Sequence, residues 1–130
     1  MTRRLPDIEA LLLTDVLTDV TNRGTRIPAD VATRLPFRAV YKLGGTVFHP
    51  KFMDRPQVQI VTLAATRAAA SDAAEAAREA LFDAVDAQTR FPGGVIHKVV
   101  EVASPFEVRT GTEPDGVFRF DQTHQIFTRP

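Results

Sequence analysis

Apolar positions recur with the period of an α-helix near the start of the chain. Acidic residues such as Asp15 and Asp19 lie on the opposite side of the helical wheel. The apolar face consists of Leu12, Leu13, Val16, Leu17 and Val20. This spacing predicts a helix that begins after Pro6-Asp7 and runs to about Val20. Gly24 then suits the C-terminal cap of that helix.

A second helical pattern follows in the middle of the chain. Ser71 is a suitable N-cap and Glu75 lies near the capping-box position, so a helix is predicted from Ser71 to about Thr89. Its apolar stripe is rich in small side chains, which allow close packing on a sheet. The stripe consists of Ala70, Ala74, Ala77, Leu81, Ala84 and Val85.

Four other segments alternate apolar and polar residues, or are apolar throughout, as β-strands do. Gly44-Gly45 is expected to end the first of these strands, and Ser104-Pro105 the third. Residues 25–35 favour neither a helix nor an extended segment. The predicted strands are Phe37–Leu43, Gln57–Ala64, Val95–Val102 and Val117–Thr128.

The order of these elements predicts an α+β domain, with two helices packed on one face of a mostly antiparallel β-sheet. A chain of 130 residues fits a single domain, which we expect to span residues 1–130. The core of such a domain is predicted to contain Leu12, Val16, Ile60, Leu81, Val85, Phe118 and Phe120.

Residues 44–56 are predicted to form a long protruding loop that contains two prolines. Loops of this length without structure of their own are uncommon and are often functional. Aromatic, Met and Arg side chains are enriched at protein interfaces, so the loop is a candidate assembly arm. The alternative is that its apolar side chains fold back onto the core. The candidate interface residues are Phe48, Lys51, Phe52, Met53 and Arg55.

Charge and composition narrow the possible functions. Lys and Arg together number 16, as do Asp and Glu, so the net charge is zero, whereas general binders of DNA or membrane surfaces usually carry a basic excess. The absence of Cys excludes disulfides and thiolate metal sites. No apolar run approaches the roughly 18 residues of a membrane span. We therefore expect synthesis in the cytoplasm and no membrane contact.

The residues capable of catalysis form no recognisable active-site motif. His49, His97 and His124 lack the spacing of a metal pair, and the glycine pairs form no phosphate-binding loop. The acidic pair Asp15 and Asp19 is interpreted as solvating charge on a helix surface, as is the pair formed by Glu75 and Glu79. We therefore expect a protein-binding protein that is not an enzyme and has no cofactor or metal.

Four segments together carry a resemblance to a known family. They are residues 5–12, 38–45, 54–64 and 125–129, with the sequences LPDIEALL, RAVYKLGG, DRPQVQIVTLA and QIFTR. With the alanine-rich helix after the third of them, the chain resembles, over nearly its full length, the tail terminator proteins of long-tailed bacteriophages. These proteins are also called minor tail or tail completion proteins.

The resemblance implies a structural virion protein that forms a ring, usually a hexamer, at the head-proximal end of the tail tube. Such a ring ends tube polymerisation at the length set by the tape measure protein and provides the surface for head–tail joining. The implied partners are further copies of the chain, the major tail tube protein, a head-completion or stopper protein and the tape measure protein. DNA passes through the lumen without specific binding, and zero net charge suits that passage.

Three other hypotheses remain open at this point. The first is a head–tail connector or stopper protein of similar size. The second is a small α+β ligand-binding domain or enzyme, unrelated to phages, with an apolar pocket under the helices. The third is a bacterial protein of related fold in a contractile or gene-transfer machine. Neighbouring genes for a major tail protein and a tape measure protein would distinguish these hypotheses.

Overall fold

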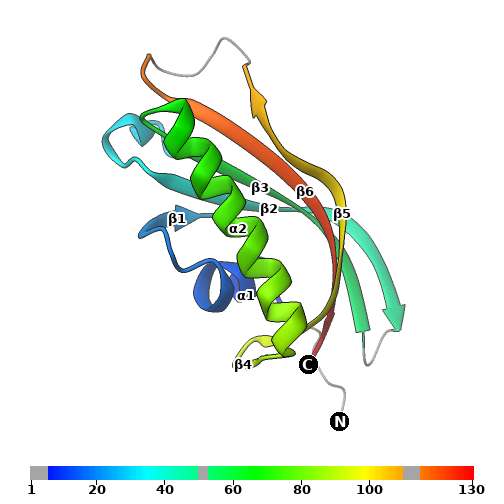
Figure 1. Cartoon of the computed structure of the whole chain (residues 1–130). Coiled ribbons are helices and arrows are strands. Elements are labelled where there is room, and N and C mark those ends of the chain that lie inside the picture. Colours follow the sequence, from blue (N-terminus) through cyan, green and yellow to red (C-terminus); the bar gives the residue numbers. More distant parts are fainter. Residues whose placement is uncertain (1–5, 50–52, 110–114) are drawn as a thin grey trace.

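The computed structural model describes residues 6–49, 53–109 and 115–130 (Figure 1). Two helices, α1 (Ile8–Leu11) and α2 (Arg67–Ala87), accompany six strands. α2 crosses one face of a curved sheet, and the first helical segment lies beside it (Figure 1). The strands are β1 (Asn22–Gly24), β2 (Phe37–His49), β3 (Met53–Ala64), β4 (Arg90–Phe91), β5 (Gly94–Val108) and β6 (Phe118–Arg129).

The six strands form one sheet in the order β1-β2-β3-β6-β5-β4. All neighbouring strands run antiparallel except β1, which pairs in parallel with Phe37–Ala39 of β2. The prediction of an α+β fold is confirmed, and the sheet is mixed because of β1. β1, which is only three residues long, was not predicted from the sequence.

The prediction that residues 44–56 form a loop is wrong for the part that the structure describes, residues 44–49 and 53–56. β2 continues to His49 and pairs with β3 from Gly44↔Gln57 to His49↔Met53, so the segment is the outer part of a β-hairpin. Gly44 does not end the strand, because it takes φ +126° at a register shift that follows Lys42. Glycine adopts this backbone conformation without steric cost, and a β-bulge lets the strand continue.

The first helix is shorter than predicted. Asp7 caps α1, and its Oδ1 accepts a hydrogen bond from the amide of Ala10 at 3.2 Å. A π-helical turn, Leu12–Val16, follows directly, and the amide of Leu17 donates to the carbonyl of Leu12 at 2.7 Å. The helical segment therefore ends four residues before the predicted end. Gly24 belongs to β1 and is not a helix cap.

The segment that the sequence left open is neither a long helix nor a strand. Within residues 25–35 the structure has a single 3₁₀ turn, Val31–Thr33. Val31 is buried against Phe37 and Val61, on the sheet face opposite the cluster that contains the helices. This segment therefore covers part of the second face of the sheet.

α2 begins earlier than predicted and buries the predicted stripe. Thr66, not Ser71, is the N-cap, and its Oγ1 accepts a hydrogen bond from the amide of Ala69 at 3.1 Å. The helix ends where Gln88 takes the left-handed conformation, with φ 48°. Val85 is partly buried. The rest of the stripe is fully buried, as predicted, and consists of Ala70, Ala74, Ala77, Leu81 and Ala84.

The prediction that Ser104-Pro105 ends a strand is also wrong, because β5 runs through both residues to Val108. Its pairing with β6 shifts register between Glu101 and Ala103 and again between Ala103 and Phe106. Proline has no amide hydrogen to donate, so it is tolerated at the edge of a sheet or at a bulge. β5 provides both conditions at this position.

One large core cluster unites both helical segments with the sheet. It contains Leu11, Leu12 and Leu81 from the helices and Val40 and Ile60 from the strands. Of the seven predicted core residues, four are buried: Leu12, Ile60, Leu81 and Phe120. The other three are partly buried and pack against the core: Val16, Val85 and Phe118.

We expect Leu81→Ala or Ile60→Ala to lower the free energy of unfolding by at least about 2 kcal/mol, since each change leaves a cavity in a packed core. Both side chains are 0% exposed. Urea denaturation of the purified domain measures the loss. Glu79→Ala, an exposed change on the same helix, is the control and should cost less than about 0.5 kcal/mol. A similarly small loss for Leu81→Ala would contradict its place in the core.

Candidate assembly surface

The outer edge of β5 is open over most of its length. β4 pairs with Gly94 and Val95, where β5 begins. The Gln88 side-chain amide then donates to the carbonyl oxygens of Ile96 and His97, at 3.4 and 3.2 Å. From Lys98 to Val108, no strand in the described part of the chain pairs with the outer side of β5.

The opposite edge of the sheet is open in a similar way. β1 covers Phe37–Ala39, where β2 begins. The Glu9 carboxylate then accepts a hydrogen bond from the amide of Lys42 at 3.4 Å. Among the residues that the structure describes, no strand pairs with the outer side of β2 from Leu43 to His49. Unpaired edges offer backbone donors and acceptors to another strand, and most proteins protect them.

Exposed large apolar side chains gather on these two strands. Leu43 of β2 is 53% exposed, and Val102 and Phe106 of β5 are 56% and 48% exposed. Val100, also on β5, is 39% exposed. Within the described residues, the exposed large apolar side chains all belong to these two edge strands. Apolar surface beside an open strand edge is typical of a site that binds another protein chain.

From the sequence, residues 44–56 are singled out as a loop, but the β5 edge is not identified. Val100 and Val102 alternate with less apolar residues, and Pro105 interrupts the pattern. We interpreted that proline as a strand break. A proline within an alternating segment is also typical of an edge strand. Pro105 could therefore have identified β5 as an edge strand from the sequence.

Three of the five predicted interface residues, Phe48, Met53 and Arg55, lie in the outer part of the β2–β3 hairpin. Lys51 and Phe52 are outside the described residues. Phe48 lies on β2 and Met53 on β3, and the structure describes the backbone of these two residues. The role of the hairpin in assembly stays a prediction.

Arg55 is half-buried on β3, close to an aromatic ring. Its guanidinium carbon lies 5.8 Å from the centre of the Phe127 ring. The ammonium nitrogen of Lys98 lies 5.6 Å from the same ring, so two cations from different strands approach one aromatic side chain. Cation–π contacts of this kind hold long side chains in place. Phe127 and Lys98 were not singled out in the sequence.

His124 lies inside the domain, in a chain of buried polar contacts. Its Nε2 donates to Oε1 of Gln122 at 2.7 Å, and the Gln122 amide donates to the carbonyl of Ala74 at 2.9 Å. Its Nδ1 has no hydrogen-bond partner among the described residues. Burial lowers the pKa of His124, Glu101 opposes this by raising the pKa, and Arg78 lowers it further. The imidazole is therefore neutral near pH 7, and it contacts Gln122, whose side chain joins β6 to α2.

We expect this histidine to make the domain less stable in acid. The folded-state pKa lies below the unfolded value of about 6.5, so stability falls as pH decreases through about 6.5 towards the folded pKa. His124→Gln keeps a side-chain donor and should reduce the loss of unfolding free energy between about pH 7.5 and pH 5.5. His97→Gln changes an exposed histidine and should keep the wild-type pH dependence. Identical pH dependence in all three proteins would contradict this role for His124.

No metal site is found among the described side chains. His97 is exposed on β5, and the His49 side chain is outside the described part of the structure. Within the residues described, no group of three or more His, Asp or Glu side chains is placed to hold a metal ion. In the same residues, no helix is long and apolar enough to cross a membrane.

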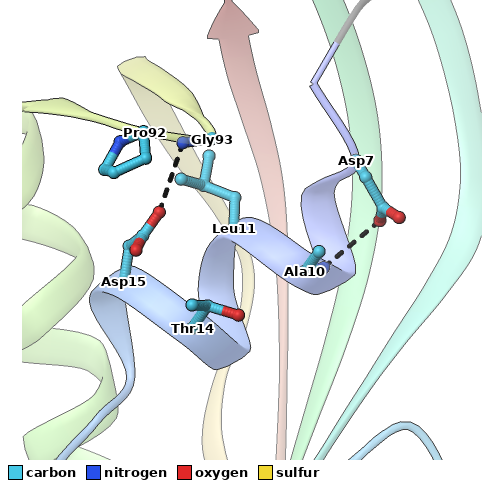
Figure 2. A pocket seen from close by; sticks show the side chains of 7 residues that line it. All are labelled: Asp7, Ala10, Leu11, Thr14, Asp15, Pro92 and Gly93. Carbon is cyan, nitrogen blue, oxygen red and sulfur yellow. Dashed lines mark hydrogen bonds between the residues drawn. The ribbon is translucent and has the colours of Figure 1, made fainter.

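A hollow of about 380 Å³ lies between the first helical segment and the turn before β5 (Figure 2). Two carboxylates line it, and both already accept backbone hydrogen bonds. Asp7 binds the amide of Ala10, and Oδ2 of Asp15 accepts from the amide of Gly93 at 3.3 Å. The remaining lining is mostly apolar, with Leu11 among it. Among the described residues that line the hollow, no hydrogen bond joins a nucleophile to a base. The open edges of β2 and β5 are therefore the stronger candidate for a functional surface.

Comparison with known proteins adds two findings. Residues 4–117 match the model of a family described as phage tail termination protein. The fold is similar to a chain in a solved structure described as the virion of a native gene transfer agent (GTA) particle, with a TM-score of 0.53 and 16% sequence identity. That likeness covers 96% of this chain and 92% of the other, so it extends over the whole domain. A comparison with curated proteins finds no match.

Proposed function

The chain belongs to the family of phage tail termination proteins, and from this premise we propose that it forms a ring that ends the tail tube. The ring sits at the head-proximal end of the tube, stops its polymerisation and provides the surface for head–tail joining. The observation that carries this proposal is the family match, which covers residues 4–117. Membership of this family makes the chain a structural protein of a phage-type virion tail.

The strand edges support the formation of a ring. A closed ring of identical subunits needs two different surfaces on each subunit that fit one another. β2 and β5 border opposite sides of the main sheet, and each has an open stretch with exposed apolar side chains. In the described part of a single subunit, no strand pairs with the outer side of either stretch. Assembly into a ring, for which we propose six copies, covers them.

The proposed partners follow from the position of the ring. One face of the ring contacts the major tail tube protein, and the other contacts a head-completion or stopper protein. The tape measure protein sets the length at which the ring is added. A chain with zero net charge suits a lumen that passes DNA without holding it, because strong affinity for phosphates requires an excess of basic residues.

Deletion of the gene in cells that produce the particles tests the proposal. We expect tails that are longer than normal and lack heads, and we expect the intact gene, supplied separately, to restore them. Micrographs of purified particles give tail length and head attachment. Headless tails of normal length would favour a connector or stopper function instead. Tails of normal length joined to heads would contradict both functions.

A further inference from the structure

The two open edges run in opposite directions. β2 is antiparallel to β3, β3 to β6, and β6 to β5, so β2 and β5 are antiparallel to each other within one subunit. Neighbours in a ring are related by rotation about one axis. Such a rotation largely preserves the direction of strands that run close to that axis. The β2 edge of one copy therefore faces the β5 edge of the next copy in antiparallel orientation.

We infer that neighbouring subunits join by antiparallel pairing of these edges, so that one β-sheet continues from subunit to subunit. The partner of the open β2 edge is thus β5 in a second copy of this chain. This inference rests on the proposed ring and names the contact that closes it. Pairing of this kind satisfies backbone donors and acceptors on both edges at once.

Part of each strand edge is already covered within the subunit, and the uncovered part is what can pair with a neighbouring subunit. On β2, β1 and Glu9 cover the edge as far as Lys42, which leaves Leu43–His49. On β5, β4 and Gln88 cover the edge as far as His97. Pro105 has no amide hydrogen, and the pairing of β5 with β6 is interrupted between Ala103 and Phe106, so the inferred pairing ends at Ser104. The stretch Lys98–Ser104 itself contains the register shift between Glu101 and Ala103. The two stretches have the same length.

End-to-end alignment of the two equal antiparallel stretches gives the register that we infer. Each stretch also contains a register shift against its partner strand in the same subunit, between Val47 and His49 in β2 and between Glu101 and Ala103 in β5. Leu43 faces Ser104 of the next subunit, and His49 faces Lys98. Leu43 then lies diagonally beside Val102, which brings two exposed apolar side chains together. Their removal from water adds an apolar contribution to the backbone hydrogen bonds.

This register requires neighbours to be displaced along the strands. Within one subunit, Gly44 pairs with Gln57, Gln57 with Gln125, and Gln125 with Val100, so Gly44 and Val100 lie at the same level. In the inferred register, the residue of the next subunit that faces Gly44 is Ala103 rather than Val100. Strands that are tilted relative to the axis of a closed sheet produce a stagger of this kind. We therefore expect the strands to be tilted in the ring.

Disulfide cross-linking tests the contact, and the natural chain contains no Cys to interfere. In the double variant Leu43→Cys/Ser104→Cys, mild oxidation should produce a ladder of covalent species, from dimers up to the closed ring. The ladder should disappear on reduction. Cross-linking is done on the purified full chain and on assembled particles. Before oxidation, the urea midpoint of each variant should match that of the wild type, because both positions are exposed.

Three controls separate the inferred contact from chance collisions. Each single variant should give no ladder, because a chain with one Cys cannot form species beyond a dimer. Leu43→Cys/Glu79→Cys places the second Cys on the exposed side of α2 and should give no ladder either. Pairs of Leu43→Cys with Val100→Cys, Val102→Cys or Phe106→Cys test other registers. A ladder from one of these pairs would support the edge contact and correct its register.

The remaining outcomes would overturn the inference. In one outcome, micrographs show rings, but no double variant cross-links more than Leu43→Cys/Glu79→Cys does. The ring would then close through another surface, and the proposed function would still stand. Dimers from the Ser104→Cys single variant, without a ladder from any double variant, would show that β5 pairs with itself. If neither rings nor cross-links form, in purified protein or in particles, both the contact and the proposed ring are wrong.

Discussion

Replacement of residues 48–53 by Asn-Gly is expected to leave a folded domain that no longer supports normal tails. Val47 pairs with Asp54, so a two-residue turn can join them directly, and Asn-Gly is a favoured sequence for such turns. The change removes four of the five candidate interface residues and keeps Arg55. It also keeps Asp54, which pairs with Thr128 of β6, so the main sheet retains its partners.

Two measurements separate assembly from folding. Urea denaturation of the purified variant should give an unfolding free energy close to that of the wild type. Micrographs of particles should show tails that are over-long or unattached to heads. A large loss of stability would instead mean that the end of the hairpin folds back onto its own domain. Normal tails from the folded variant would contradict the proposed assembly arm.

A length-matched variant distinguishes reach from side-chain chemistry. Replacement of residues 48–53 by an equal number of Gly and Ser residues keeps the length of the segment but removes Phe48, Lys51, Phe52 and Met53. If these side chains bind the neighbour or the tube, this variant should fail as the shortened one does. If it assembles normally while the shortened one fails, the length of the segment is what assembly needs.

The elements that the sequence predicted well are those with a strong local pattern. α2 alternates small apolar residues with charged ones at helical spacing, and its buried stripe is confirmed apart from the partly buried Val85. The helix starts earlier than predicted because Thr66 is also a capping residue and good helix formers follow it. Local sequence cannot decide between two adequate caps, since each gives its helix a similar stabilisation.

The predictions that failed concern residues whose effect depends on neighbouring strands. Gly44 and Pro105 were interpreted as strand ends, but each lies within a strand, at or beside a register shift. Whether such a residue ends a strand depends on how the adjacent strand is paired, and that pairing is not encoded locally. The same reason explains why the candidate site was incomplete. The open edges of β2 and β5 become visible only once the order of strands in the sheet is known.

A half-buried ion pair was missed for a related reason. Asp19 was interpreted as solvating charge, but it accepts hydrogen bonds from both terminal nitrogens of Arg38, the second at 3.2 Å. Arg38 lies on β2 with its side chain 0% exposed, and it also donates to the carbonyl of Ala73 at 2.7 Å. Asp19 remains 44% exposed. The pair therefore joins the N-terminal segment, the sheet and α2.

Burial raises the pKa of Asp19. The hydrogen bonds from Arg38 and its positive charge lower the pKa by more than burial raises it, so the pKa lies below the usual value. A carboxylate whose folded-state pKa is lowered stabilises the fold above its unfolded pKa of about 4. This contribution is lost as pH falls through the folded-state pKa. The Asp19→Ala variant should therefore lose less stability in strong acid than the wild type does.

Asp19→Ala is expected to lower the free energy of unfolding by about 2–4 kcal/mol, because it leaves the buried Arg38 charge without its partner, while water can reach part of that charge through the half-exposed Asp19 position. Arg38→Met should cost less, about 1–3 kcal/mol, because the Asp19 carboxylate can reach water and the main loss is the unpaired carbonyl of Ala73. Urea denaturation near pH 7 measures both changes. Asp86→Ala, which removes an exposed carboxylate from α2, is the control and should cost less than about 0.5 kcal/mol.

The double variant Asp19→Ala/Arg38→Met tests whether the unpaired Arg38 charge causes the loss of stability. If the cost of Asp19→Ala comes from an isolated buried charge, replacement of that charge by Met should restore part of the lost stability. The double variant should then be more stable than Asp19→Ala alone, although it lacks both members of the ion pair. If the double variant is instead less stable than either single variant, each side chain stabilises the fold through contacts of its own. The isolated charge would then not be the cause of the loss.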